Sequence, residues 1–191
     1  MPANPYKLVR AVFLTIDSAK VSGVALSEPR YDSRAALRGY ECDRFGLAVN
    51  QLQRESWLDE ALLIARCEEL PLVIVGEEWT SHGLSRTAYK QLNESWGLWR
   101  AALERQKKPR DVVHVVRVNP QSWRSKLFGK RRPRTREGLK TLAVQYAHRV
   151  LKAPPHLSDD IAEALCLRAW AERAPEVHEL LEPKKKKRKA A

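Results

Sequence analysis

Residues 9–26 read VRAVFLTIDSAKVSGVAL, and the fold class follows from this stretch. The run from Val9 to Ile16 is β-rich and nearly continuous in apolar residues, which is typical of a strand buried on both faces. This strand ends at Asp17, and a short polar turn separates it from a second apolar run, GVAL, at residues 23–26. The stretch therefore predicts a buried strand, a carboxylate at its end, and a neighbouring strand.

The rest of the chain continues this pattern of strands and helices. Leu72–Val75 is a second buried strand that runs directly into Glu77 and Glu78. Ser158 is a plausible N-cap for the last helix. Strands are also expected at 38–42 and 112–118, and helices at 44–69, 84–105 and 135–151. This order predicts an α/β fold with a mixed five-stranded sheet flanked by helices, in which ligands gather at the strand ends.

The composition indicates a globular protein with a phosphate-rich partner. Hydrophobic residues make up 43% of the 191 residues, as in an ordinary single domain. Lys and Arg number 35 against 23 Asp and Glu, for a net charge of +12, which points to nucleic acid. No apolar run is long enough to span a membrane, and three widely spaced cysteines suggest neither a disulfide framework nor a zinc site. We expect a soluble, unexported protein in a reducing compartment.

The positive charge is concentrated in two stretches. Residues 120–140 carry eight cations against one anion, and residues 184–189 read KKKKRK. The tail could be a nuclear localisation signal, a nonspecific nucleic-acid arm or an addition made for expression. We expect residues 1–174 to form the domain and residues 175–191 to form a disordered basic tail.

Four carboxylates are candidates for one site. Asp17 and Glu77 each follow a buried strand, and Asp160 and Glu163 lie three apart, on one face of the last helix. Hard cations such as Mg²⁺ take several carboxylate oxygens and complete their shells with water and substrate phosphate. Two such ions, about 4 Å apart, can activate water for attack on phosphorus and stabilise the leaving oxygen. The pattern predicts phosphodiester hydrolysis.

Four segments in this order resemble a known family: FLTIDSAKVSGVAL, PLVIVGEEW, VNPQSWRSKLFG and SDDIAEALCLRAW. They are similar to the RuvC-type Holliday junction resolvases of the ribonuclease H-like superfamily, over roughly residues 10–172. Asp17 and Gly23 occupy the places of the family's first Asp and of the Gly that opens its second strand. The family has two Asp residues three apart in its last helix, where this chain has Asp160 and Glu163.

The resemblance implies a fold, an activity and a set of partners. It implies a ribonuclease H-like nuclease that resolves four-way DNA junctions as a homodimer. Its catalytic and metal-binding residues would be Asp17, Glu77, Asp160 and Glu163, with two Mg²⁺ ions that Mn²⁺ can replace. Glu163, where the family has Asp, and the turn Asp17-Ser18-Ala19, where many members have Asp-Pro-Gly, are departures. Glu78 is an alternative to Glu77, although adjacent strand residues point to opposite faces and the register favours Glu77.

The basic stretch supplies candidate phosphate contacts, which give affinity without reading the DNA sequence. The candidates are Arg124, Lys126, Lys130, Arg131, Arg132, Arg134 and Arg136. A stripe from Tyr89 to Leu103 is either a dimer seam or part of the monomer core. We expect the protein in the cytoplasm, at the nucleoid, of a bacterial or phage-infected cell, or in a nucleus if the tail is a localisation signal.

Each feature also has a plainer explanation. Carboxylates beside Ser158 complement the dipole at any helix N-terminus, and Glu77-Glu78 taken alone could begin a solvated loop. The alternative functions are a nuclease of the same fold that acts on RNA/DNA hybrids, flaps or forks, and a DNA-binding relative without catalysis. A lost carboxylate is the expected mark of the inactive relative, and all four positions here are acidic.

Overall fold

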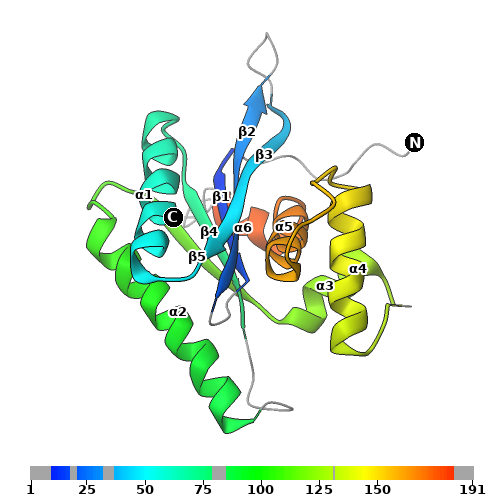
Figure 1. Cartoon of the computed structure of the whole chain (residues 1–191). Coiled ribbons are helices and arrows are strands. Elements are labelled where there is room, and N and C mark those ends of the chain that lie inside the picture. Colours follow the sequence, from blue (N-terminus) through cyan, green and yellow to red (C-terminus); the bar gives the residue numbers. More distant parts are fainter. Residues whose placement is uncertain (1–9, 18–20, 32–36, 79–84, 131, 183–191) are drawn as a thin grey trace, which may run out of the picture.

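Five strands form one mixed sheet in the order β3-β2-β1-β4-β5 in the computed structural model (Figure 1). The structure describes residues 10–17, 21–31, 37–78, 85–130 and 132–182. The strands are β1 (Val12–Asp17), β2 (Ser22–Tyr31), β3 (Leu37–Ala48), β4 (Leu72–Glu77) and β5 (Val113–Val118). The helices are α1 (Gln51–Cys67), α2 (Arg86–Gln106), α3 (Pro120–Phe128), α4 (Arg136–Arg149), α5 (Asp159–Ala171) and α6 (Pro175–Leu181). The predicted fold class is confirmed.

Helices cover both faces of the sheet. α1 and α2 lie on one face, and α3, α4 and α5 lie on the other (Figure 1). Because side chains alternate along a strand, Val12, Leu14 and Ile16 of β1 pack on the α1/α2 side. Phe13, Thr15 and Asp17 therefore face α5, and the hydroxyl of Thr15 donates a hydrogen bond to the carbonyl oxygen of Ala164 at 2.9 Å.

The strand directions bring two carboxylates to one edge of the sheet. β1 and β4 are parallel, and so are β4 and β5, so the carboxyl ends of all three lie at the same edge. In β4, Val73 and Val75 face the α5 side, and Glu77 continues that alternation. Ile74 faces the other side, as does Gly76, against which the ring of Trp96 packs. The sheet thus directs Glu77 toward Asp17 and leaves Glu78 exposed.

Two expected boundaries are wrong. The helix predicted over residues 44–69 begins only at Gln51, capped by the side chain of Asn50, because residues 44–48 continue β3 and pair with β2. Residues 175–181, expected in the disordered tail, form α6, because Val177 packs into the core on the α5 side of the sheet. Residues 183–191 lie outside the described residues.

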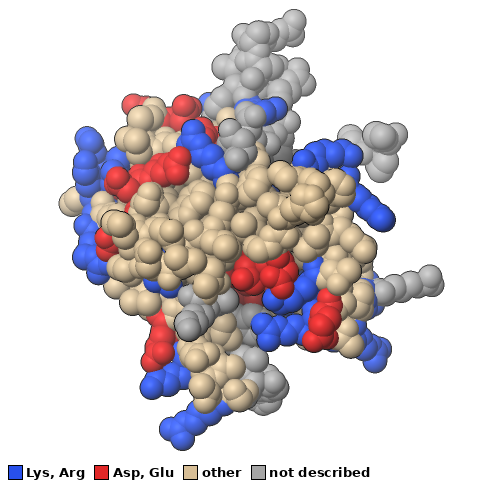
Figure 2. Space-filling view, in the orientation of Figure 1, with Lys and Arg blue, Asp and Glu red and all other residues tan. Residues whose placement is uncertain are grey.

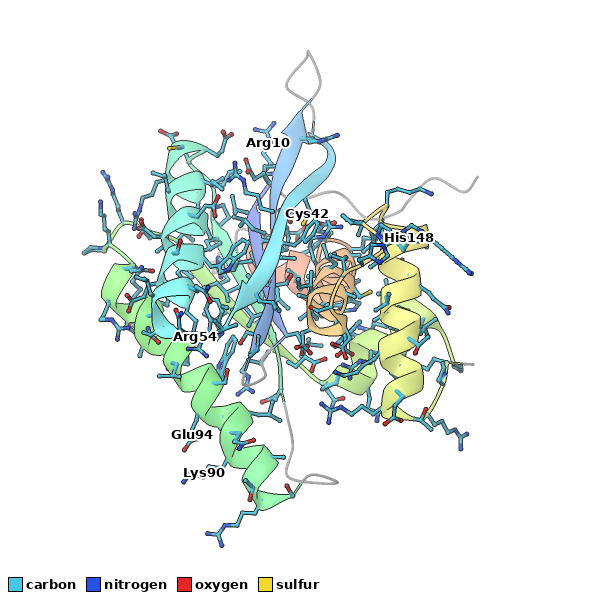
Figure 3. The ribbon with its side chains drawn as sticks, in the orientation of Figure 1. Arg10, Cys42, Arg54, Lys90, Glu94 and His148 are labelled. Carbon is cyan, nitrogen blue, oxygen red and sulfur yellow. The ribbon has the colours of Figure 1, made fainter. Side chains whose placement is uncertain are left out.

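The stripe from Tyr89 to Leu103 lies mostly in the monomer core. Trp96, Trp99 and Leu103 are buried between α2 and the sheet. Tyr89 and Leu92, nearer the start of α2, are only partly buried. Figure 3 shows Lys90 and Glu94, an ion pair with 3.7 Å between Nζ and Oε1, on the part of α2 that extends away from the sheet. The carboxyl-terminal part of the stripe, from Trp96 to Leu103, therefore belongs to the monomer core.

The described cysteines form no disulfide. Cys42, Cys67 and Cys166 are free thiols. Within the described ranges, no helix has both the length and the apolar character needed to cross a membrane.

Candidate active site

Asp17 and Glu77 lie next to each other, at the carboxyl ends of β1 and β4. Asp17 is 6% exposed and Glu77 is 1% exposed. Glu163 of α5 is also buried, and Asp160, one turn earlier in α5, is partly buried. The negative charges of Glu77, Glu163 and Asp160 all act on Asp17. The structure thus brings together the four carboxylates predicted from the sequence, which we call the acidic cluster.

Gly23 lets α5 approach the sheet closely enough to complete the acidic cluster. Gly23 pairs with Asp17 across the β1–β2 ladder. A Cβ atom at Gly23 would lie 1.9 Å from the carbonyl oxygen of Asp160 and 2.3 Å from its carbonyl carbon. The backbone at the start of α5 therefore rests directly on β2, and only glycine leaves room for it. Ser158 caps α5, because its hydroxyl accepts a hydrogen bond from the backbone N–H of Ile161.

Arg124 bridges two members of the acidic cluster. Its Nη2 atom lies 3.0 Å from Oε1 of Glu77 and 2.6 Å from Oε1 of Glu163, and the residue is 9% exposed. The sequence predicted Arg124 as a phosphate contact, and the structure places its guanidinium among the carboxylates. Sequence reasoning missed this role because it depends on acidic residues from β4 and α5, far away along the chain.

Trp123 fixes the orientation of Glu77. Its indole Nε1–H donates a hydrogen bond to Oε1 of Glu77 at 2.8 Å, and its side chain is fully buried. The guanidinium of Arg124 also stacks near this indole ring, 4.9 Å from the ring centre. Both residues lie on α3, which follows β5 directly and has Pro120 in its first turn. The short helix after β5 therefore supplies two donors to the same carboxylate oxygen of Glu77.

Lys140 of α4 contacts the edge of the acidic cluster and was not among the predicted site residues. Its Nζ atom pairs with the carboxylate of Asp159 and lies 3.6 Å from Oδ1 of Asp160. Figure 2 shows acidic side chains beside Lys and Arg side chains on the face of the molecule that carries α3 and α5. Only the docking of α4 against α5 brings Lys140 to this place, so its position in the sequence carried no signal.

Burial and mutual repulsion change the acidity of the acidic cluster. Burial, followed by the charges of Glu77, Glu163 and Asp160, raises the pKa of Asp17 well above its ordinary value, and Arg124 opposes this shift. Burial also raises the pKa of Glu77 to about 7, although Arg124 and the Trp123 hydrogen bond lower it in part. Arg124 and Lys140 thus compensate only some of the negative charge, and the site favours a further cation.

The residues fit a divalent metal in their chemistry. All four members of the acidic cluster offer carboxylate oxygens, and Oε2 of Glu77 is buried without a hydrogen-bond partner among the described residues. In the parts of the chain that the structure describes, no three Asp, Glu, His or Cys side chains are arranged to hold one ion. The guanidinium of Arg124 contacts Oε1 of both Glu77 and Glu163.

The pKa of Glu77 predicts how stability depends on pH. Between pH 4.5, its ordinary pKa, and about pH 7, the folded state holds a proton on Glu77 that the unfolded state has released. The contribution of Glu77 to the unfolding free energy is therefore greatest below pH 4.5, and it is lost as pH rises through about 7. Relative to Glu77→Gln, the metal-free wild type should lose a few kcal/mol of unfolding free energy over this window, since one pKa unit corresponds to about 1.4 kcal/mol.

Urea unfolding of both proteins in EDTA at several pH values measures this difference. Gln keeps an oxygen that accepts the hydrogen bond from Trp123, so packing stays matched between the two proteins. A difference in unfolding free energy that does not change between pH 4.5 and pH 7.5 would contradict the raised pKa.

The sheet order and the helices on its two faces define a class of protein: the chain has the ribonuclease H-like fold. Within this class it is similar to RuvC from Thermus thermophilus, with a TM-score of 0.55 and 15% identity, over 87% of this chain and 96% of that chain. It is also similar to T. thermophilus RuvC in complex with a Holliday junction substrate, with a TM-score of 0.57 and 10% identity, over 91% of this chain and 99% of that chain. No protein-family model matches the sequence, and no curated protein matches it.

Proposed function

We propose that this chain is a metal-dependent endonuclease that cleaves branched DNA, with the four-way junction as its substrate. The observation that carries the proposal is the convergence of Asp17, Glu77, Asp160 and Glu163 at one edge of the sheet. The fold is shared with a RuvC whose structure holds a Holliday junction, which supports the choice of branched DNA over other phosphodiesters. The net charge of +12 supports a nucleic-acid substrate.

The acidic cluster would hold two Mg²⁺ or Mn²⁺ ions. When bound, such ions supply an activated water nucleophile and stabilise the charge on the leaving oxygen. Asp17 and Glu77 offer their oxygens from the rigid ends of two paired strands, which limits their freedom to move. Trp123 holds Oε1 of Glu77 in place, and Oε2 has no hydrogen-bond partner among the residues that the structure describes.

Arg124 has two roles in this proposal. Before DNA and metal arrive, it compensates the buried charges of Glu77 and Glu163, which would otherwise destabilise the folded chain. Its guanidinium also matches the geometry of a phosphate group, with which it can form paired hydrogen bonds. If Glu77 and Glu163 held the cations, Arg124 would be released from these carboxylates and could bind a phosphate of the DNA.

In this proposal, the remaining cations of the basic stretch contact the DNA backbone farther from the phosphodiester bond that is cleaved. Lys130, Arg134 and Arg136 are exposed and free to approach phosphates. Arg132 donates hydrogen bonds to Gln121 and to the carbonyl oxygen of Gly129, so it also braces the loop after α3. Lys126 pairs with Glu176, and Arg131 lies outside the described residues.

The proposed substrate favours a homodimer, because a four-way junction has two strands to cut symmetrically. α2 offers a surface for this contact, since Tyr89 and Leu92 near its start are only partly buried and Leu98, past its middle, is 45% exposed. In a bacterial or phage-infected cell, such an enzyme would work at the nucleoid.

The test is a comparison of DNA substrates. The purified chain is incubated with a mobile four-way junction, with linear duplex of the same sequence and with an RNA/DNA hybrid, in Mg²⁺, in Mn²⁺ and in EDTA. We expect cleavage of the junction, in two strands, only when a divalent ion is present. Cleavage of linear duplex at an equal rate would exclude a junction enzyme, and cleavage of the hybrid alone would favour a ribonuclease H activity.

A further inference from the structure

The corner between β3 and α1 lies at the same edge of the sheet as the acidic cluster. Asp17 pairs with Gly23 across the β1–β2 ladder, and Gly23 pairs with Leu47 across the β2–β3 ladder. Neighbouring strands lie about 4.8 Å apart, so the backbone of Leu47 is roughly 10 Å from that of Asp17. After β3 ends at Ala48, the chain leaves the sheet and begins α1 at Gln51.

This corner exposes three aliphatic side chains. Leu47 is 37% exposed, Val49 is 48% exposed and Leu52 is 75% exposed. Among the described residues they are three of the nine large hydrophobic side chains that are exposed, and they come from six consecutive positions. Single exposed apolar residues are ordinary, whereas several in one place mark a contact surface. We call residues 47–52 the apolar corner.

Leu47 lies on the face of the sheet that carries the acidic cluster. Phe45 and Leu47 are two positions apart in β3 and therefore point to the same face, and Phe45 packs against the core beneath α5. Gly23, which pairs with Leu47, is in turn covered by the backbone of Asp160. The apolar corner therefore begins beside the start of α5.

Two hydrogen bonds hold the apolar corner in shape. The side chain of Asn50 accepts a bond from the backbone N–H of Gln53 at 2.9 Å, and the side chain of Gln53 accepts one from the backbone N–H of Val49 at 2.7 Å. A hydrophobic residue before a helix cap often packs against the fourth residue of its helix, which here is Arg54. Val49 thus keeps its apolar surface for another partner.

The charges around the apolar corner favour a polyanion. Residues 47–54 contain no Asp or Glu, and the amino end of α1 carries the partial positive charge of a helix. Arg54, labelled in Figure 3, is 5% exposed, and its Nε atom has no hydrogen-bond partner among the described residues. The first acidic residue of α1, Glu55, is paired with Arg105 at 2.6 Å. The positive field of Arg54 acts through space and needs no direct contact with a ligand.

DNA that lies across the acidic cluster would also reach the apolar corner. In the sheet order, β1 and β4 stand at the centre, the basic stretch follows β5 on one side, and the apolar corner follows β3 on the other. A strand of duplex advances about 3.4 Å per nucleotide, so a distance of roughly 10 Å is about three nucleotides. The apolar corner therefore falls within a few nucleotides of the phosphate at the acidic cluster.

We propose that the apolar corner packs against the base pair at the branch point of a DNA junction, where Val49 and Leu52 cover the base face that the branch leaves unstacked. Leu is among the side chains that insert at opened base steps in DNA-binding proteins. The amino end of α1 and the field of Arg54 attract the flanking phosphates. The choice of DNA rests on the proposed function. In linear duplex every internal base pair is stacked on both faces, so this contact favours branched DNA.

The experiment compares two leucines of α1. Leu52→Gln removes the most exposed side chain of the apolar corner and places a good helix former there. Leu63→Gln is the matched control, because Leu63 is 58% exposed on the same helix, about three turns farther from the acidic cluster. The full chain is titrated in EDTA against an immobile four-way junction and against a linear duplex of the same sequence. Fluorescence anisotropy gives a Kd for each DNA.

We expect Leu52→Gln to raise the Kd for the junction on the order of tenfold, because the burial of one leucine side chain is lost. The Kd for linear duplex should stay within about twofold of the wild type, and Leu63→Gln should stay within about twofold on both DNAs. A fluorescent base, 2-aminopurine, placed beside the branch reports the contact directly. Its emission should rise when the wild type binds, since an aliphatic side chain replaces a quenching base, and should rise less with Leu52→Gln.

Three results would overturn the proposal. They are an equal rise in Kd for junction and duplex with Leu52→Gln, an equal rise for the junction with Leu63→Gln, and 2-aminopurine emission that does not change on binding. These measurements use neither a divalent metal nor cleavage. A chain that cuts the junction but binds it equally well after Leu52→Gln would contradict only this contact. A chain that binds the junction through Leu52 without cutting it would contradict only the nuclease.

Discussion

Replacing Asp17 by Asn is expected to reduce junction cleavage by on the order of a thousandfold, which corresponds to about 4 kcal/mol of activation free energy. Asp17 sits at the end of β1, beside Glu77 and close to Glu163 and Asp160. Asn has nearly the same shape but removes one negative charge from the set that would hold the cations. The effect should therefore appear in the rate constant rather than in DNA binding.

The same substitution should not weaken the fold. Burial and like charges raise the pKa of Asp17, which means that its ionised form is costly in the folded state. Asn removes that cost, so the metal-free variant should unfold at the same urea concentration as the wild type or at a higher one. Loss of cleavage together with loss of stability would point to a structural role instead.

Glu78→Gln is the matched control for Asp17→Asn. Glu78 adjoins the acidic cluster in the sequence, but it is exposed because alternation along β4 directs Glu77 inward. Cleavage by this variant should stay within about twofold of the wild type. If Glu78→Gln abolished cleavage and Asp17→Asn did not, the acidic cluster would not be the active site.

Gly23→Ala is expected to lower the unfolding free energy by roughly 3 kcal/mol and to abolish cleavage as well. The new Cβ atom would lie 1.9 Å from the carbonyl oxygen of Asp160, which is backbone and cannot rotate away. The start of α5 must therefore shift off β2. That movement would carry Asp160 and Glu163 away from the strand ends, so one methyl group disturbs both packing and chemistry.

Gly97→Ala is the control for the glycine substitution. Gly97 lies in α2, and a Cβ atom there would meet nothing within 4 Å. Alanine in an exposed helix is favoured over glycine by about 1 kcal/mol, so this variant should be slightly more stable than the wild type. Urea unfolding and junction cleavage are measured on both variants. A loss of less than 1 kcal/mol for Gly23→Ala would mean that α5 is not seated against β2 in this way.

The sheet and the strand-end carboxylates Asp17 and Glu77 could be predicted because both depend on local patterns, whereas the choice of Asp160 and Glu163 also rested on the family resemblance. Buried strands read as continuous apolar runs, and the carboxylates that follow them must meet where parallel strands end. Residues 44–48 were assigned to the wrong element, because a short mixed segment fits a helical period as well as a strand. α6 was missed because its three apolar residues, Val177, Leu180 and Leu181, lie in a short and otherwise polar stretch, and only tertiary packing makes Val177 part of the core.

The partners within the site could not be predicted from the sequence. Arg124 belongs to a run of cations that reads as a solvated surface, and nothing local distinguishes it from Lys130 or Arg134. Its burial follows from the position of α3 between β4 and α5, which is a property of the whole fold. The same holds for the hydrogen bond from Trp123 to Glu77.

The positions of the four carboxylates along the chain also determine when, during synthesis, the proposed activity could first arise. β1 and β4 supply their carboxylates early in synthesis, but Asp160 and Glu163 lie on α5, near the carboxyl end of the described chain. A nascent polypeptide whose α5 has not yet been synthesised would therefore carry only two of the four proposed ligands and would not cut. Under the proposed function, cleavage would begin only after α5 has docked against β2 and brought Asp160 and Glu163 to the strand ends.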